Sequence, residues 1–388
     1  MSGLTPNAQN RMDKRILIDA TNVNIMQPGG GSYCTQAYIE AFLALYPGRI
    51  DVMHPQEAHI RDERYTTLEV PSRPLLQAAL GCVTGHLHRG ANFLIHYIQL
   101  HPDTYDTVLI STGLYAGGII EQLHRMHIRV IVLHHNFEPE YRMDSRSILT
   151  LRGMTDRFVR YWEKKGYLQA DVNLFLTQQD KQRFEEEYGT RPDNHVSGVF
   201  EPTYQRQAID SVPPTDSAVI TCALGDIQNQ APLLRFADTY MPVFRELLPG
   251  WHIELMGRNP SQTICFMAEK NPYIHLTANP KDLRELASRS KIYLCPMDAG
   301  GGLKLRIMDG LRAGQVVLVH ERSARGYDQL VNEPFFFVYN DEETFRTQLL
   351  KVVQYVQSKT YSRQIVQDRY YQLFGMQAGI QRLEKIMS

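Results

Sequence analysis

The sequence predicts an α/β protein built from two doubly wound parallel sheets. Short runs of apolar, β-branched residues alternate with longer amphipathic segments along the chain, which is typical of parallel strands joined by crossover helices. The runs are apolar throughout rather than alternating with polar residues, as strands buried on both faces require. A polar stretch at 200–217, which carries Pro202, Pro213 and Pro214, interrupts the series and predicts a boundary between two domains.

The apolar runs predict the strands in chain order. They are ILID at 16–19, VLIS at 108–111, VIVLHH at 130–135, VNLFLT at 172–177, AVITCAL at 218–224, HIELMG at 252–257, IYLCP at 292–296 and VVLVH at 316–320. Helical periodicity predicts helices between them at 33–46, 180–188, 231–248 and 282–289.

These elements group into domains. We expect an N-terminal Rossmann-like domain at 13–200, a linker at 201–217 and a C-terminal Rossmann-like domain at 218–365. A last helix at 366–388 is expected to pack back on the N-terminal domain. Doubly wound sheets bind ligands at the carboxyl ends of their strands, so we expect the two domains to face each other across a ligand-binding cleft.

Composition narrows the function. The chain has 41 basic and 42 acidic side chains and a net charge of -1, which argues against a nucleic-acid partner. Its 5 cysteines lack metal-ligand spacing and suggest buried thiols in a reducing compartment. The sequence has no apolar run long enough to span a bilayer and no signal-peptide core at its start, so we expect a cytoplasmic protein.

The amphipathic stretch at 73–100 has two interpretations. It carries Arg73, Arg89 and several histidines, which suits a peripheral contact with the inner face of a membrane or the reception of a substrate. The simpler interpretation is a pair of packed helices joined near Gly90.

Three consecutive glycines, Gly300, Gly301 and Gly302, follow the strand expected at 292–296 and lead into a helix. Glycines allow backbone N–H groups to approach an anion closely, and a helix start adds partial positive charge. Lys304 and Arg306 add full positive charges within one turn. This combination predicts a pyrophosphate site.

Asp309 lies three residues beyond Arg306, on the same helix face. Its carboxylate is suited to accept hydrogen bonds from the diol of a ribose. The alternative is a simple surface ion pair between Arg306 and Asp309, and the glycines then serve only a tight turn.

Residues 300–317 read GGGLKLRIMDGLRAGQVV. This segment resembles the GGGTRLKILEALAxGxPVV segment of GT-B glycosyltransferases of the retaining, family-4-like type. The resemblance is strong over 273–330 and diffuse before 200. It implies that Lys304 and Arg306 occupy the basic donor-binding positions. It also implies that Asp309 occupies the position of the glutamate that holds the ribose of a nucleotide-sugar donor.

Other segments extend the resemblance. LMGRNP at 255–260, which holds Gly257 and Arg258, looks like the family's strand end beside the donor. The loop at 320–326 is similar to the family's loop after the next strand. Near the N-terminus, Gly29, Gly30, Gly31 and Ser32 match the glycine loop before helix one, where a phosphate or the acceptor is expected.

The chain also departs from the family pattern. Gly301 stands where the family often has a second glutamate, and Asp226 and Gln230 stand where an arginine and a lysine usually grip the diphosphate. Either Lys304 and Arg306, together with Arg258, take over the diphosphate, or the donor site is weakened.

Polar residues follow the strand at 130–135. His134, His135, Asn136 and Glu138 are expected at its carboxyl end, where such folds place their chemistry. By resemblance, one of the two histidines occupies the family's histidine position beside the donor sugar, and we expect the other to be a core residue. Asn136 and Glu138 are candidates for binding acceptor hydroxyls, although Glu138 also fits a solvated loop.

The sequence offers no metal site that would serve this reaction. His86 and His88 lack a neighbouring carboxylate or cysteine, and no paired aspartates follow a strand, so we expect metal-independent chemistry and no cofactor.

The resemblance implies sugar transfer, with retention, from a nucleoside diphosphate sugar to a hydroxyl of a glycan or lipid-linked acceptor. Two alternatives remain open. One is an inactive GT-B domain that binds glycan or supports a partner transferase, and the other is a nucleotide-sugar 2-epimerase.

Overall fold

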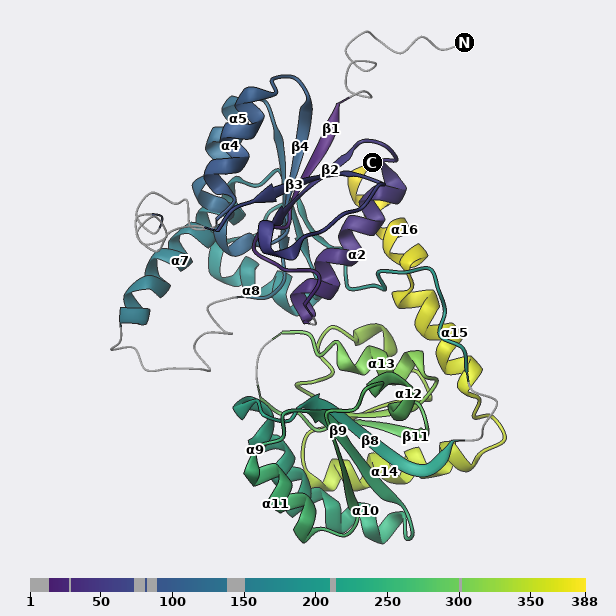
Figure 1. Ribbon diagram of the computed structural model, residues 1–388. Helices are drawn as coiled ribbons and strands as arrows, with labels where there is room; N and C mark the ends of the chain where they lie inside the picture. The colour runs from purple at the N-terminus through teal and green to yellow at the C-terminus, as the bar shows by residue number, and fades with distance from the viewer. Residues whose placement is uncertain are drawn as a thin grey trace, which may run out of the picture. The chain divides into compact units, whose positions relative to one another are not determined.

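The computed structural model describes residues 14–27, 29–72, 81, 89–137, 151–209, 214–299 and 302–388 (Figure 1). The chain divides into two compact units. Unit 1 contains the described residues up to Tyr204 together with Gly375–Ser388, and unit 2 contains those of Gln205–Phe374. Glu138, Gly300 and Gly301 lie outside the described residues, as does most of 73–88.

Unit 1 is built on a parallel sheet. In the part of the chain that is described, its strands are β1 (Arg15–Asp19), β2 (Ile50–Pro55), β3 (Thr66–Val70), β4 (Tyr105–Ile110), β5 (Arg129–His134), β6 (Val172–Phe175) and β7 (Asn194–Val196). Their spatial order is β3-β2-β1-β4-β5-β6-β7, and neighbouring strands run parallel. The direction of winding therefore reverses between β1 and β4, which is the topological switch point of the sheet.

Helices cover both faces of this sheet. They are α2 (Gly30–Leu45), α4 (Ala91–Leu100), α5 (Ile120–Arg125), α7 (Leu151–Gln169), α8 (Gln178–Tyr188) and α16 (Met376–Met387), with the 3₁₀ turns η1 (Gln56–Ala58) and η2 (Gly113–Gly118). One face packs Leu17, Val108 and Val132 against α4 and α5, and α2 and α16 lie on the other side of the strands (Figure 1). Within 73–100, the described helix α4 follows Gly90 and buries Leu94 in this core.

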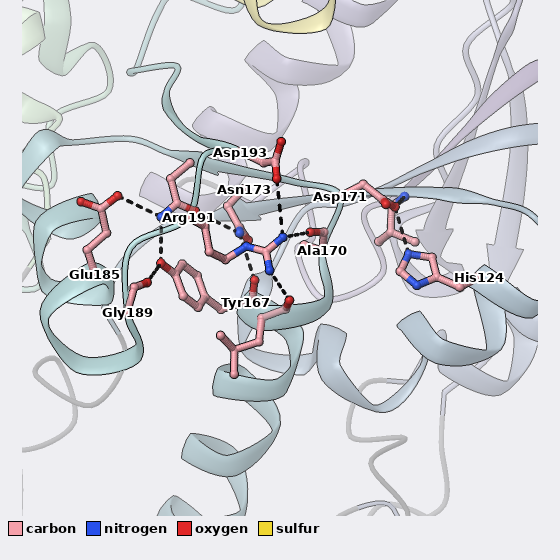
Figure 2. Close-up of polar contacts among 12 residues, drawn as sticks. His124, Tyr167, Ala170, Asp171, Asn173, Glu185, Gly189, Arg191 and Asp193 are labelled. Atoms are coloured by element: carbon pink, nitrogen blue, oxygen red, sulfur yellow. Dashed lines mark hydrogen bonds and ion pairs between the residues drawn. The ribbon is translucent and has the colours of Figure 1, made fainter.

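A buried polar network ties β6 and β7 to α7 (Figure 2). Asn173 donates hydrogen bonds to the carbonyl of Tyr167 at 3.0 Å and to Oδ1 of Asn194 at 3.1 Å, while Asn194 donates to the Tyr167 hydroxyl at 2.7 Å. At the amino ends of the strands, Arg191 donates to the carbonyl of Ala170 at 2.8 Å. These bonds satisfy amide groups that would otherwise be costly to bury.

Unit 2 contains a second parallel sheet. Its described strands are β8 (Thr215–Ala223), β9 (His252–Arg258), β10 (Ile274–Ala278), β11 (Ser290–Cys295), β12 (Val316–His320) and β13 (Phe336–Tyr339). The order is β10-β9-β8-β11-β12-β13, with parallel neighbours throughout. The switch point of this sheet falls between β8 and β11.

The helices of unit 2 are α9 (Ile227–Arg235), α10 (Met241–Leu247), α11 (Gln262–Lys270), α12 (Leu283–Ala287), α13 (Arg306–Arg312), α14 (Glu342–Gln357) and α15 (Arg363–Phe374). A π-helical turn, η3 (Phe236–Tyr240), joins α9 to α10, and a 3₁₀ turn, η4 (Asp328–Leu330), follows β12. On one face Tyr240, Tyr339 and Phe345 form an aromatic cluster beneath α14. On the other, α13 approaches β11 so closely that a Cβ at Gly310 would lie 2.5 Å from Cγ of Tyr293.

The α/β class is confirmed, and every predicted strand is present with small changes at its ends. The structure adds β2, β3, β7, β10 and β13, which the apolar runs do not reveal. β3 and β10 carry exposed or half-buried polar residues, and β2 buries Asp51 and His54. β13 is a short apolar run, FFVY, that is not among the strands predicted from the sequence. The helix predicted at 231–248 is three segments, because η3 interrupts it.

The C-terminal helix α16 packs against α2 within unit 1. Arg382 donates to the carbonyls of Ser197 at 2.8 Å and Val199 at 3.2 Å. Beside it, a Cβ at Gly379 would lie 2.3 Å from the ring of Phe200, which is fully buried. The contact between α16 and the 197–200 segment therefore depends on a residue without a side chain.

Two buried histidines lie in the core of unit 1. His54 on β2 bonds to the Tyr65 hydroxyl through Nε2 at 3.1 Å, and His134 on β5 bonds to Asn173 Oδ1 through Nε2 at 2.9 Å. Burial lowers the pKa of each to about 4. Both imidazoles are therefore neutral in the folded chain at neutral pH.

We predict that Gly379→Ala destabilises unit 1 by about 1–3 kcal/mol, because the added methyl group overpacks Phe200. Helix propensity alone would give the opposite sign, a gain of about 0.5–1 kcal/mol. Urea unfolding should be followed by Trp162 fluorescence in a Trp251→Phe background, which reports unit 1. Gln377→Ala, on the exposed side of α16, is the control and should change the free energy of unfolding by less than about 0.5 kcal/mol.

We predict that the stability of unit 1 falls as the pH drops from about 6.5 toward 4. In this window the unfolded chain protonates its histidines, while His54 and His134 remain neutral in the fold, so unfolding takes up protons. Each contributes a slope of about 1.4 kcal/mol per pH unit. His54→Gln should flatten the slope of urea-unfolding free energy against pH. An unchanged slope would contradict the assignment.

Candidate functional site

The carboxyl ends of β8 and β11 meet at the switch point of unit 2. Residues 224–226 follow β8, the described residues 296–299 and 302–305 follow β11, and the loop 321–327 follows β12 next to them. Parallel strands have their carboxyl ends at the same edge of the sheet. This edge therefore brings together segments that are about seventy to a hundred residues apart along the chain.

Arg306 is the charged group at the centre of this edge. Arg306 is half-buried, and its guanidinium donates to the carbonyl of Thr221 near the end of β8, at 3.3 Å. Desolvation opposes its charge, but Cys295, Tyr293, Cys222 and, to a smaller extent, Asp226 raise its pKa overall. The described residues give it no ion pair. A fixed guanidinium with donors to spare is suited to bind an oxyanion.

Asp226, which stands in a position the family reserves for a basic residue, caps a helix. Its carboxylate accepts a hydrogen bond from the backbone N–H of Gln228 at 3.0 Å, at the start of α9. The same side chain contributes to the raised pKa of Arg306. Its negative charge is therefore partly balanced by the helix start and by the guanidinium. Gln230 follows within the first turn of α9.

Asp309 points to other partners than Arg306. Its Oδ1 accepts from Nη1 of Arg312 at 2.8 Å and lies 3.7 Å from Nε of Arg284. The ion pair three residues along the helix therefore joins Asp309 to Arg312, while Arg306 points toward β8. The Asp309 side chain remains 32% exposed, so its carboxylate is accessible at the surface.

The other predicted donor-site residues of unit 2 have distinct places. Gly302 adopts a φ of 75°, a left-handed conformation that favours glycine. The backbone carbonyl of Lys304 accepts a hydrogen bond from the Tyr327 hydroxyl at 3.0 Å. The helix begins at Arg306, three residues later than the sequence suggests. Gly257 is buried, and a Cβ there would lie 1.8 Å from the carbonyl of Cys222, so it is needed for strand packing. Arg258 is exposed at the end of β9.

Sequence reasoning missed several residues that shape this edge. Arg235 on α9 forms an ion pair with Asp298 immediately before the glycine loop. Ser323, after β12, donates to the carbonyl of Met297 at 2.7 Å. Both contacts hold the loop after β11 to neighbouring elements, and no spacing in the sequence signals them because the partners are far apart along the chain.

The switch point of unit 1 brings together the ends of β1 and β4. The backbone N–H of Ser111 donates to the carbonyl of Asp19 at 3.1 Å, and the Asp19 carboxylate accepts from the Thr21 hydroxyl at 2.7 Å. The loop after β1 leads to Gly29, Gly30 and Gly31, the last two of which lie in the first turn of α2.

Ser32 closes this loop. Its hydroxyl donates to the carbonyl of Asn24 at 2.9 Å. Gly29, at the cap position of α2, provides no side-chain hydrogen bond, so the helix start relies on other groups for its free N–H donors.

The two histidines after β5 have different environments. The ring of His134 stacks on Phe175 at a centroid distance of 4.9 Å, and a Cβ at Gly113 would lie 2.3 Å from its Nδ1. It is enclosed in the core. His135 is partly exposed as a residue, yet its Nε2 is buried and has no hydrogen-bond partner among the described residues. Burial lowers the pKa of His135 to about 4, opposed by a hydrogen bond with the Ser111 backbone.

Further polar atoms without partners lie beside His135. In the described part of the chain, the hydroxyls of Ser111 and Thr112, which follow β4, are buried and make no hydrogen bond. Because β4 and β5 are neighbours, these hydroxyls and the His135 ring lie at adjacent strand ends. Buried polar atoms are normally satisfied, so this group is a candidate site for a hydroxylated ligand.

The remaining candidate residues of unit 1 are Asn136 and Glu138. Asn136 is half-buried directly after His135, and Glu138 lies outside the described residues. Within the described ranges, none of the candidate residues belongs to a cluster of three potential metal ligands. No helix of the described residues is both long and apolar enough to cross a membrane.

Comparisons with known proteins identify the fold. Neither the family models nor the curated proteins contain a match. Among solved structures, HepE of Anabaena in complex with UDP aligns over 96% of this chain and 99% of its own, with a TM-score of 0.65 and 12% identity. The lipopolysaccharide outer core galactosyltransferase WaaB aligns over 96% and 99%, with a TM-score of 0.65 and 10% identity.

Sucrose-phosphate synthase from Thermosynechococcus elongatus also aligns over 96% of this chain and 98% of its own, with a TM-score of 0.65 and 11% identity. At such identities the likeness concerns the fold. The chain has the α/β fold of the GT-B glycosyltransferases, with two parallel sheets along one polypeptide.

Proposed function

We propose that this protein is a glycosyltransferase that uses a nucleoside diphosphate sugar as donor, with UDP as the nucleotide. The observation that carries the proposal is the guanidinium of the half-buried Arg306 at the β8–β11 switch point, which has no ion pair among the described residues. Structural neighbours support the choice of donor, because HepE has been solved with UDP and with UDP-glucose.

Arg306 would hold the diphosphate. Its bond to the Thr221 carbonyl fixes the guanidinium over the strand ends and leaves donors for phosphate oxygens. Lys304 and the three consecutive glycines at 300–302 lie just before it in the chain, and Arg258 ends β9, the neighbour of β8 in the sheet. Positive charge fixed here would stabilise the charge that grows on the departing diphosphate.

Asp309 would bind the nucleoside. Its exposed carboxylate is oriented by Arg312 and is available to accept hydrogen bonds from the ribose diol. An aspartate has a shorter reach than the glutamate at the family's corresponding position, so the ribose would lie closer to α13.

His135 would position the transferred sugar. Its unpartnered Nε2 and the hydroxyls of Ser111 and Thr112 offer hydrogen bonds to sugar hydroxyls, and a neutral imidazole can both donate and accept. The loop of Gly29 to Ser32 and the side chain of Asn136 would receive the acceptor, which we take to be a glycan or a lipid-linked hydroxyl. The transfer would proceed with retention and without a metal ion.

We predict that UDP at a hundred times its dissociation constant raises the melting temperature of unit 2 by roughly 5–10 °C, with GDP and ADP giving smaller shifts. Arg306→Ala should abolish most of the shift, because the diphosphate loses its charged partner. Trp251 fluorescence in a Trp162→Phe background reports unit 2.

The matched control is Arg289→Ala. Arg289 precedes β11 at the opposite edge of the sheet, pairs with Glu285 and is 57% exposed, so its loss should leave the UDP shift intact. A wild-type protein that no nucleotide stabilises would favour the alternative of an inactive domain that binds glycan, and would sink the proposal.

We predict that His135→Ala slows the release of UDP from UDP-sugars by on the order of a hundredfold and leaves UDP affinity unchanged, since the histidine contacts the sugar rather than the nucleotide. His101→Ala, an exposed histidine of unit 1, should change neither. Equal rates in both variants would refute the role of His135.

The same assay tests the finer features of the proposal. Turnover should persist in EDTA, and proton NMR of the product should show the anomeric configuration of the donor. Appearance of an epimerised nucleotide sugar without any acceptor would instead identify an epimerase.

A further inference from the structure

A cluster of two histidines and one glutamate lies in unit 2 away from the strand ends described above. His252 and Glu254 are on β9, two residues apart and hence on one face, and His275 on β10 is the register partner of Glu254. One oxygen of Glu254 lies 2.9 Å from Nε2 of His252 and 3.6 Å from Nδ1 of His275. The three ligand atoms all lie within 4.8 Å of one another.

We propose that His252, Glu254 and His275 form a binding site for a divalent transition metal, with Zn²⁺ the best fit. In tetrahedral zinc coordination, bonds of about 2.0–2.1 Å place neighbouring ligand atoms about 3.3–3.4 Å apart. The observed separations of 2.9 and 3.6 Å lie on either side of that value, so small side-chain adjustments suffice. Two imidazoles and one carboxylate also form a ligand set that proteins use for zinc.

The backbone prearranges the ligands. Parallel pairing fixes His275 opposite Glu254, and strand periodicity brings His252 to the same face. The imidazole rings lie together, with centroids 4.3 Å apart and planes inclined by 25°. The side chains of His252, Glu254 and His275 are 28%, 23% and 54% exposed, so an ion can enter from solvent and keep a water as its fourth ligand.

The position of the cluster assigns it a structural role. His252 begins β9 and Arg258 ends it, so the cluster lies toward the opposite end of the strand from the proposed donor site, on the order of 15–20 Å away at the rise of an extended chain. β10 is an edge strand of this sheet, and a metal here would link it to its neighbour β9. It would stabilise the margin of unit 2 and take no part in sugar transfer.

Zinc binding to the full-length protein tests this site directly. We expect calorimetric titration of chelator-treated protein with ZnCl₂ to show one site that His275→Ala and Glu254→Gln each weaken at least tenfold. His124→Ala is the matched control, because His124 also pairs with a carboxylate, Asp171, at 2.9 Å but has no second imidazole in that pair. It should leave zinc affinity unchanged.

Two spectroscopic readouts locate the metal. Co²⁺ in place of zinc should give the visible absorption of a tetrahedral site, and it should quench the fluorescence of Trp251, which precedes His252 in the chain. With excess zinc, the melting temperature of unit 2 should rise by roughly 5 °C or more.

Three results would overturn the proposal. One is the absence of zinc binding at micromolar concentrations, which would leave the cluster as a hydrogen-bonded group. The second is binding that persists in both His275→Ala and Glu254→Gln. The third is binding that is lost only when His86 and His88 are replaced together, which would move the metal to that HxH pair.

Discussion

The guanidinium of the half-buried Arg306, fixed at the switch point of unit 2, is the interaction on which the candidate donor site depends. Arg306 lies over the ends of β8 and β11 and gives a hydrogen bond to the Thr221 carbonyl. A positive charge in such a place needs negative partners, because desolvation is costly. Asp226 is one of the groups that raise the pKa of Arg306, and under the proposed function a diphosphate would add negative charge beside it.

The surrounding structure holds this guanidinium in place. Gly310 allows α13 to lie against Tyr293, and Gly257 allows β9 to lie against the backbone of Cys222. The Arg235–Asp298 ion pair and the bond from Ser323 to Met297 secure the loop that precedes α13. Packing, loop contacts and charge therefore act on one small region of unit 2.

Unit 1 presents a complementary chemistry. The ends of its neighbouring strands β4 and β5 carry neutral groups rather than positive charge: the His135 ring, whose pKa is lowered to about 4 by burial, and two hydroxyls without partners in the described residues. Neutral donors and acceptors suit sugar hydroxyls, whereas the charged edge of unit 2 suits phosphates. This difference in charge is the basis for the proposed roles of the two units in sugar transfer.

Much of the fold follows from local sequence patterns. Continuous apolar runs identified the buried central strands, because both of their faces contact helices. Strands such as β3 and β10 cannot be predicted from apolar runs, because each mixes polar with apolar residues and is partly exposed. The π-helical turn within 231–248 escaped notice as well, because a helical period continues through it.

Less of the candidate site than of the fold can be predicted from the sequence. The glycine loop and Arg306 could be identified from composition and spacing, but the Thr221 carbonyl that orients the guanidinium could not, since backbone acceptors leave no trace in the sequence. Spacing also could not distinguish His134 from His135. Their difference arises from Gly113, Phe175 and Asn173, which only the folded chain brings to one of the two rings.

A crystal structure of the full-length protein with UDP bound would test the role of Arg306. We expect the β-phosphate within hydrogen-bond distance of the Arg306 guanidinium, beside residues 300–304, with the ribose at Asp309. A nucleotide bound elsewhere, or bound with Arg306 still directed only at Thr221, would contradict the assignment of this edge as the donor site.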